Sequence, residues 1–189
     1  MKRSIIEPTL SGMAAEGRSY RGCLYVGLMI TPEGPKVVEF NARFGDPETQ
    51  VVLPLYDGDL LDLMEAACKG SMASIAPVPV APRGSAVCVV LASEGYPDAY
   101  ETGKPIHGLE HLSGPGGLIA FHSGTMNKDG SVVTSGGRVL GLTAITESMD
   151  LEQTIKRAYD GVRQISFEGM HFRKDIGAKA LVRAASVPA

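Results

Sequence analysis

The sequence predicts a mixed α/β (α+β) protein built from two parts, and three observations support this prediction. Before residue 71, two strand patterns joined by a turn precede one helix pattern. Residues 71–84 carry three prolines, which cannot donate backbone hydrogen bonds inside a central strand or a helix. After residue 85, several short strand patterns end in one amphipathic helix. We therefore expect a hairpin with a helix, a boundary, and then a small antiparallel sheet with a helix.

The first part is expected to hold an antiparallel hairpin and a helix. Residues 23–30 form a continuous apolar run and residues 36–41 a second strand pattern, with a turn containing Pro and Gly between them. Asp59 is a typical helix N-cap, because apolar residues follow it at helical spacing. Gly70 suits the end of that helix, so a helix is predicted between Asp59 and Gly70.

The second part shows strand patterns separated by glycine-rich turns, over residues 86–91, 118–122, 131–134 and 138–145. A helix is predicted next, because apolar residues recur at steps of four and three, with Asp150 and Glu152 near the positive end of its dipole. The apolar stripe consists of Leu151, Ile155, Ala158, Val162 and Ile165.

The composition is that of a folded globular protein and excludes several classes of function. Of the 189 residues, 44% are hydrophobic and 21% charged, and the net charge is -3. No run of Lys or Arg supplies the positive stripe that nucleic-acid binding requires. The apolar runs are too short for a membrane span, and the amino-terminal residues lack the apolar core of a signal peptide. A cytoplasmic protein with no nucleic-acid or membrane partner is expected, with Cys23, Cys68 and Cys88 as small core residues.

The end of the second predicted strand carries a candidate metal site. Alternate residues of a strand share one face, so Glu39 and Asn41 are expected to project together, with Val38 and Phe40 facing the core. One or two protein oxygens are enough for Mg²⁺, which keeps waters and substrate phosphates as its other ligands. The alternative is that both side chains merely lie on the wet face of a hairpin.

The residues that follow favour the metal–phosphate interpretation. Arg43 offers a planar fork for phosphate or carboxylate, Gly45 permits a sharp turn, and Asp46 before a proline is followed by a further acid at Glu48. This density of function-capable side chains exceeds what a turn requires.

The stretch Ser135–Arg138 lies between two predicted strands and has two explanations. Gly136 and Gly137 could form a hairpin turn that needs positive φ, or an anion-binding nest that Arg138 closes on a phosphate. The residues themselves leave both explanations open.

Taken together, Gly22–Met29 and Glu39–Gln50 resemble the phosphoribosylamine-glycine ligase (glycinamide ribonucleotide synthetase) family of the ATP-grasp superfamily. The resemblance continues in the family's order through Ala92–Pro97, Phe121–Thr125, Thr134–Leu140 and Arg173–Gly177. It implies the C-terminal half of an ATP-grasp domain over residues 1–76, a linker over 77–84 and the family's C-terminal domain over 85–189.

The resemblance also implies the activity of the complete enzyme. Such a ligase uses ATP to join 5-phosphoribosylamine and glycine, giving glycinamide ribonucleotide, ADP and phosphate in de novo purine synthesis. The metal, Mg²⁺ or Mn²⁺, would be held by Glu39 and Asn41. The expected catalytic residues are Arg43 and Asp46, and the expected substrate-binding residues are Glu48, Gly136, Gly137 and Arg138.

The resemblance covers only the C-terminal part of the family, and the residues that clamp ATP would precede Met1. The chain alone is therefore expected to be inactive. Three hypotheses follow: a truncated part of the ligase, one half of a split enzyme with a separate amino-terminal partner, or a non-catalytic binding or assembly domain. A monofunctional form is also expected, as is marginal stability or self-association of the isolated chain. Another ATP-grasp carboxylate-amine ligase is the close alternative.

Overall fold

The computed structural model describes residues 1–72, 84–112 and 117–181. These residues form two compact units. The first holds residues 1–46 and 57–72, and the second holds residues 47–56 together with everything described after residue 83. The predicted linker over 77–84 lies outside the described residues, apart from Gly84.

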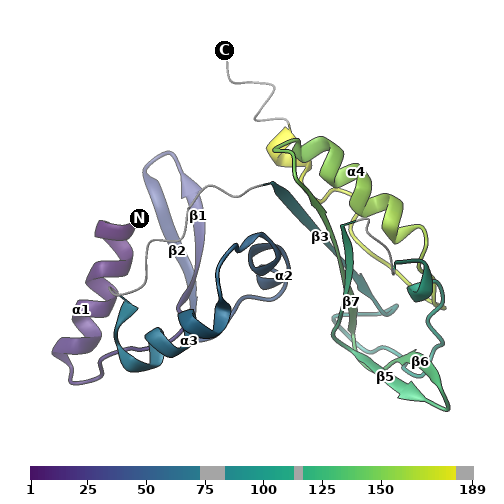
Figure 1. Cartoon of the computed structure of the whole chain (residues 1–189), viewed down its shortest axis with the longest axis horizontal. Coiled ribbons are helices and arrows are strands. Elements are labelled where there is room, and N and C mark those ends of the chain that lie inside the picture. Colours follow the sequence, from purple (N-terminus) through teal and green to yellow (C-terminus); the bar gives the residue numbers. More distant parts are fainter. Residues whose placement is uncertain (73–83, 113–116, 182–189) are drawn as a thin grey trace. The chain divides into compact units, whose positions relative to one another are not determined.

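The first unit contains the helices and the hairpin of the amino-terminal part (Figure 1). Its elements are η1 (Lys2–Ile6), α1 (Glu7–Ala15), β1 (Tyr25–Thr31), β2 (Gly34–Asn41) and α3 (Leu60–Lys69). The second unit is formed by α2 (Thr49–Val52), η2 (Leu53–Leu55), β3 (Ser85–Ala92), η4 (Leu109–Leu112), β4 (Leu118–His122), β5 (Thr125–Lys128), β6 (Ser131–Thr134), β7 (Arg138–Thr146) and α4 (Leu151–Val162).

The predicted hairpin is confirmed, since β1 and β2 pair antiparallel, but its predicted core face is wrong. The side chains of Val38 and Phe40 are 67% and 46% exposed. Two strands alone form only a small sheet, and strand alternation does not determine whether another element covers a given face. Val38 also lies at a register shift, which breaks the pairing opposite Gly27 and Leu28.

Local signals correctly predicted helix α3. Asp59 is its N-cap, and the Asp59 side chain accepts hydrogen bonds from the N–H groups of Leu61 (2.7 Å) and Asp62 (3.4 Å). Gly70 ends the helix with φ of 72°, in the left-handed region that glycine tolerates. Helix α1 was not predicted, because it buries no residue and therefore shows no amphipathic pattern.

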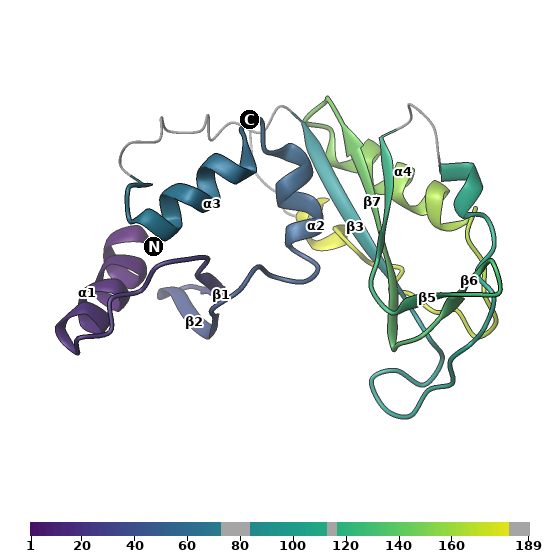
Figure 2. The same ribbon diagram turned by 60° about the horizontal axis from the view of Figure 1, so that its bottom comes forward.

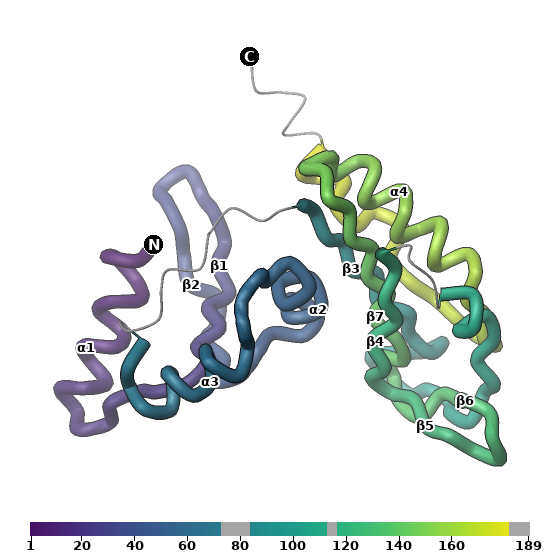
Figure 3. Tube along the Cα trace, viewed as in Figure 1, coloured from purple at the N-terminus to yellow at the C-terminus, as the bar shows by residue number. Residues whose placement is uncertain are grey.

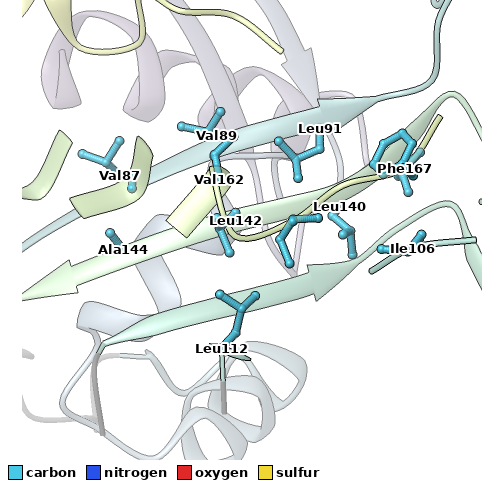
Figure 4. Packing of buried hydrophobic residues seen from close by; sticks show 13 residues of the cluster. Val87, Val89, Leu91, Ile106, Leu112, Leu140, Leu142, Ala144, Val162 and Phe167 are labelled. Carbon is cyan, nitrogen blue, oxygen red and sulfur yellow. The ribbon is translucent and has the colours of Figure 1, made fainter. Parts of the chain in front are cut away.

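The second unit is built on a three-stranded antiparallel sheet in the order β3–β7–β4. Figure 3 places β4 beside β7, and α4 packs on β3 and β7. The paired residues Val89 and Leu142 lie in one buried cluster with Val162 of α4, as Figure 4 shows. Gly161 permits this close packing, because a Cβ there would lie 3.0 Å from the Cδ2 atoms of Leu118 and Leu142.

The predicted strands of this unit are confirmed with small shifts at their ends, while β5 and α2 were not predicted. Strand β5 pairs with β6 across the turn at Asp129 and Gly130, whose φ angles are 52° and 81°. An Asp-Gly dipeptide is a signal for such a hairpin. Helix α2 packs on β3 and β7, as Figure 2 illustrates for β3, but its four residues are too few for any periodicity.

The described helices include none that is both long enough and apolar enough to cross a membrane. The expectation that all three cysteines are core residues is wrong for two of them. Cys88 is buried, whereas Cys23 is half-buried and Cys68, near the end of α3, is exposed.

One hydroxyl group of α4 makes two hydrogen bonds to the segment Arg173–Gly177. The Oη of Tyr159 donates to the carbonyl of Arg173 (2.8 Å) and accepts from the N–H of Ile176 (3.1 Å). Arg173 and Asp175 form a two-bond ion pair within this segment, which lowers the pKa of the Asp175 carboxyl.

Substitution Tyr159→Phe is expected to lower the free energy of unfolding by about 1–2 kcal/mol, because both hydrogen bonds are lost while the ring is kept. Urea denaturation followed by circular dichroism would measure it. Tyr100→Phe is the matched control, since Tyr100 is 42% exposed. Equal effects of the two substitutions would show that Tyr159 does not attach this segment.

Candidate functional site

In the first unit, Glu39 and Asn41 lie on the same face of β2. Glu39 is paired with Gly27 and Asn41 with Tyr25, and the register between these pairs is regular. Gly27 makes room for the carboxylate, because a Cβ on Gly27 would lie 3.0 Å from the Glu39 Cγ. Glu39 is exposed and Asn41 half-buried, so solvent reaches both residues.

This pair fits a hard divalent cation. It supplies one carboxylate and one amide oxygen, which are ligands that Mg²⁺ accepts alongside water and phosphate. Within residues 1–72, 84–112 and 117–181, no group of three or more His, Cys, Asp or Glu side chains is arranged to hold a metal ion. A site here would therefore need waters or substrate oxygens to complete the coordination.

The residues after β2 lead from the first unit into the second. Arg43 is exposed, and its Nη1 donates to the carbonyl of Phe44 at 2.8 Å, which leaves other guanidinium donors for a ligand. Asp46 is exposed and is the last residue of the first unit before Pro47. Glu48 is half-buried in the second unit, where it is the N-cap residue of α2.

In the second unit, three chain segments meet around Gly136 and Gly137. The N–H of Ser93 donates to the carbonyl of Gly137 (2.8 Å), and its Oγ donates to the carbonyl of Gly136 (2.9 Å). The N–H of Gly124 donates to the carbonyl of Arg138 at 2.8 Å. These contacts join the ends of β3 and β4 to the start of β7.

The hairpin-turn explanation for these glycines is wrong, because neither Gly136 nor Gly137 has a positive φ. Glycine is needed here because neighbouring segments pack too closely to leave room for a side chain. A Cβ on Gly124 would lie 2.7 Å from the Gly136 Cα, and a Cβ on Gly137 would lie 2.3 Å from a ring carbon of Tyr96. Tertiary packing, which local sequence patterns do not reveal, explains both residues.

The αR–αL form of the nest is ruled out by the same φ angles, but one observation supports anion binding by these N–H groups. Gly137 is buried, yet no acceptor within the described part of the chain receives the N–H of Gly136 or of Gly137. Buried N–H groups without an acceptor are rare in native proteins. Arg138 follows directly, with an exposed side chain.

A cavity of about 410 Å³ adjoins Ser93 but has the wrong charge for an anion. Its lining includes the carboxylates of Glu94, Glu101 and Glu168. Lys104 binds two of them, since its Nζ lies 2.9 Å from Glu101 and 2.8 Å from Glu168. This pairing raises the pKa of Lys104 and lowers the pKa of Glu101, so the lysine stays charged and connects two loops.

The structure therefore shows the predicted residues as two groups, one in each unit. Glu39 and Asn41 share a strand face in the first unit, and Gly136 and Gly137 share a backbone cluster in the second. Sequence reasoning missed Gly27 and Ser93. Ser93 lies within a segment that carried the family resemblance, but no residue pattern indicated its hydrogen bonds.

Two family models and several curated proteins match this chain. The family described as "Phosphoribosylglycinamide synthetase, ATP-grasp (A) domain" matches residues 1–49, and "Phosphoribosylglycinamide synthetase, C domain" matches residues 86–179. A phosphoribosylamine–glycine ligase of Chlorobaculum tepidum is 49% identical over 181 residues, 96% of this chain and 42% of the relative. The trifunctional purine biosynthetic protein adenosine-3 of Gallus gallus is also 49% identical, over 96% of this chain and 18% of its own length.

Two solved structures show the same fold. Phosphoribosylamine–glycine ligase from Thermotoga maritima matches with a TM-score of 0.75 and 40% identity, over 90% of this chain and 42% of that chain. The biotin carboxylase domain of Hydrogenobacter thermophilus 2-oxoglutarate carboxylase matches with a TM-score of 0.60 and 13% identity, over 92% of this chain and 40% of that chain. The second match concerns the fold alone. The chain spans about 42% of the length of the Chlorobaculum tepidum relative.

Proposed function

The chain belongs to the phosphoribosylglycinamide synthetase family, and on that premise we propose that it forms part of an ATP-dependent ligase that joins glycine to 5-phosphoribosylamine. The products are glycinamide ribonucleotide, ADP and phosphate, and the setting is cytoplasmic purine biosynthesis. The observation that carries the proposal is the order of side chains in the segment Glu39–Glu48. Two oxygen-bearing side chains on one strand face are followed by the guanidinium of Arg43 and then by two further carboxylates. We keep the division into an ATP-grasp part (1–76) and a C-terminal domain (85–189) as part of this proposal.

Glu39 and Asn41 are the proposed metal ligands for Mg²⁺, with Mn²⁺ as a substitute. Their shared face on β2 and the space that Gly27 leaves beside Glu39 support this assignment. When bound, the cation would neutralise charge on the phosphates of ATP. The two side chains contribute oxygen ligands, and their strand holds them at a set spacing.

Arg43, Asp46 and Glu48 are proposed to act on the other reacting groups. The exposed guanidinium of Arg43 stabilises negative charge on the transferred phosphoryl group or on the acyl phosphate of glycine. Asp46 and Glu48 orient the amine or the ribose hydroxyls of the ribosylamine by accepting hydrogen bonds. Positioning of this kind accounts for most of the catalysis in phosphoryl transfer.

Gly136, Gly137 and Arg138 are proposed to bind a phosphate group of a substrate. The N–H groups of the two glycines without protein acceptors and the neighbouring guanidinium support this assignment. Neutral backbone donors and one fixed positive charge suit an anion that must also leave as part of the product.

The proposal predicts that ligase activity requires both this chain and the amino-terminal part of a related ligase. With MgATP, glycine and 5-phosphoribosylamine, ADP release is expected only from the mixture, because ATP-grasp enzymes hold the nucleotide between two parts. A coupled ADP assay measures this, with each component alone as the control. A folded chain that stays silent in the mixture would favour a non-catalytic binding or assembly domain.

The metal assignment can be tested without turnover. Electron paramagnetic resonance of added Mn²⁺ is expected to show a site that Asn41→Leu weakens about tenfold or more and that Asn41→Asp retains, because only the second variant keeps an oxygen ligand. Glu33→Gln removes a carboxylate that contacts Thr31 near the other end of the hairpin, and it should leave Mn²⁺ binding unchanged. Equal binding by the Leu and Asp variants would contradict the assignment.

A further inference from the structure

Ser93 holds the peptide groups of Gly136 and Gly137 from one side. We infer that Ser93 is a positioning residue, which orients the Gly136–Gly137 peptide so that its N–H faces the phosphate. This inference rests on the proposed phosphate site. Ser93 makes no direct contact with the ligand in this inference. It acts through the two glycines.

The geometry depends on one residue that binds two successive carbonyls. The Ser93 N–H donates to Gly137 at 2.8 Å and the Ser93 Oγ donates to Gly136 at 2.9 Å. Ser93 is itself well anchored, since it is only 4% exposed and follows Ala92. Ala92 exchanges two backbone hydrogen bonds with His171, at 2.9 and 3.0 Å.

The orientation of the Gly137 N–H follows from the planarity of the peptide bond. In a trans peptide, the C=O and the N–H point in opposite directions. The Gly136 carbonyl and the Gly137 N–H belong to the same peptide group, so the bond from the Ser93 Oγ directs this N–H away from Ser93. Loss of the hydroxyl would remove the hydrogen bond that fixes the direction of this carbonyl and N–H.

The other contacts of this peptide group limit what its N–H can bind. Gly124 and Gly136 are in backbone contact, and the Tyr96 ring lies against Gly137, where even one Cβ would be 2.3 Å from a ring carbon. Gly137 is buried, and the described residues supply no acceptor for its N–H. With Arg138 next in sequence, the missing acceptor is expected to be an anion of the phosphate class.

Amide NMR of the full chain tests the inference, with inorganic phosphate and ribose 5-phosphate as the probes. In the wild type, the Gly136 and Gly137 amide resonances are expected to shift saturably with both probes. Ser93→Ala should weaken this binding by about fivefold and speed hydrogen exchange at the Gly137 N–H. Ser93→Thr, which keeps a hydroxyl, should restore tighter binding.

Ser123→Ala is the matched control, because the Ser123 side chain is exposed and its backbone N–H, not its hydroxyl, bonds to Val139 at 3.0 Å. It should bind phosphate like the wild type. If Ser93→Ala does not fold, Ser93→Cys keeps the size with a weaker donor and serves in its place.

The outcomes separate this inference from the proposed phosphate site. No amide shift in the wild type would overturn both. Normal phosphate binding by a folded Ser93→Ala, even one with a lower unfolding midpoint, would overturn the positioning role and leave the phosphate site standing. If the wild type responds to ribose 5-phosphate but not to inorganic phosphate, the ligand is a sugar phosphate, and weaker ribose 5-phosphate binding by Ser93→Ala would support the inference.

Discussion

Glu39→Ala is expected to reduce ADP release by about 100-fold or more in the mixture of this chain with an amino-terminal ligase part. The variant removes the charged member of the only oxygen pair proposed to hold the metal, while Asn41 alone leaves the cation poorly fixed. Phosphoryl transfer depends on charge neutralisation at the phosphates, so the loss should appear in kcat as well as in the KM for MgATP.

The control for this prediction is Glu33→Ala. Glu33 is also exposed and lies in the turn of the same hairpin, where its carboxylate accepts from the Thr31 hydroxyl at 2.9 Å. Its removal should leave ADP release unchanged. Because Glu39 is exposed, both variants are expected to unfold at similar urea concentrations. Unchanged ADP release by a folded Glu39→Ala variant would overturn the metal assignment. It would leave the proposed ligase activity of the mixture standing.

Gly124→Ala is expected to lower the free energy of unfolding by about 3 kcal/mol. The added Cβ would lie 2.6 Å from the Arg138 carbonyl oxygen and within 2.8 Å of both the Cα and the N of Gly136. All three are backbone atoms, so no rotamer change can relieve the contact. Because Gly124 does not have a positive φ, the cost arises from this contact alone.

Gly130→Ala is the control for the same class of substitution in the neighbouring turn. Nothing lies within 4 Å of a Cβ at Gly130, and only its φ of 81° opposes alanine. A cost of about 1 kcal/mol is expected from that strain. Urea unfolding of both variants compares them, and a Gly124→Ala variant as stable as Gly130→Ala would show that the β4 and β7 segments are not in close contact.

Phosphate binding at Gly136 should also fall in Gly124→Ala, since the contact displaces that residue.

The two groups of candidate residues could be predicted to different extents. Glu39 and Asn41 are two positions apart on one strand, so their shared face followed from strand geometry alone. The partners of Gly136 are Ser93 and Gly124, which lie far from it in the chain. Hydrogen bonds between such distant residues leave no periodic signal in one sequence.

The helix ends were predicted because their causes are local. Asp59 and Asp150 each accept a backbone N–H within three residues of their own position, and Gly70 adopts the φ that glycine alone tolerates without strain. The strands predicted at residues 86–91 and 138–145 have a related explanation, since short strand patterns between glycine-rich turns are also a local signal.

The sequence by itself thus determined the hairpin, the capped helices, the buried strands and the oxygen pair at residues 39 and 41, because each depends on neighbours a few positions away. Only the tertiary structure decided that Val38 and Phe40 are exposed, that α2 packs with the second unit, and that Ser93 holds the carbonyls of two distant glycines. Burial and long-range hydrogen bonds depend on which surfaces meet after folding, and that information is spread over the whole chain.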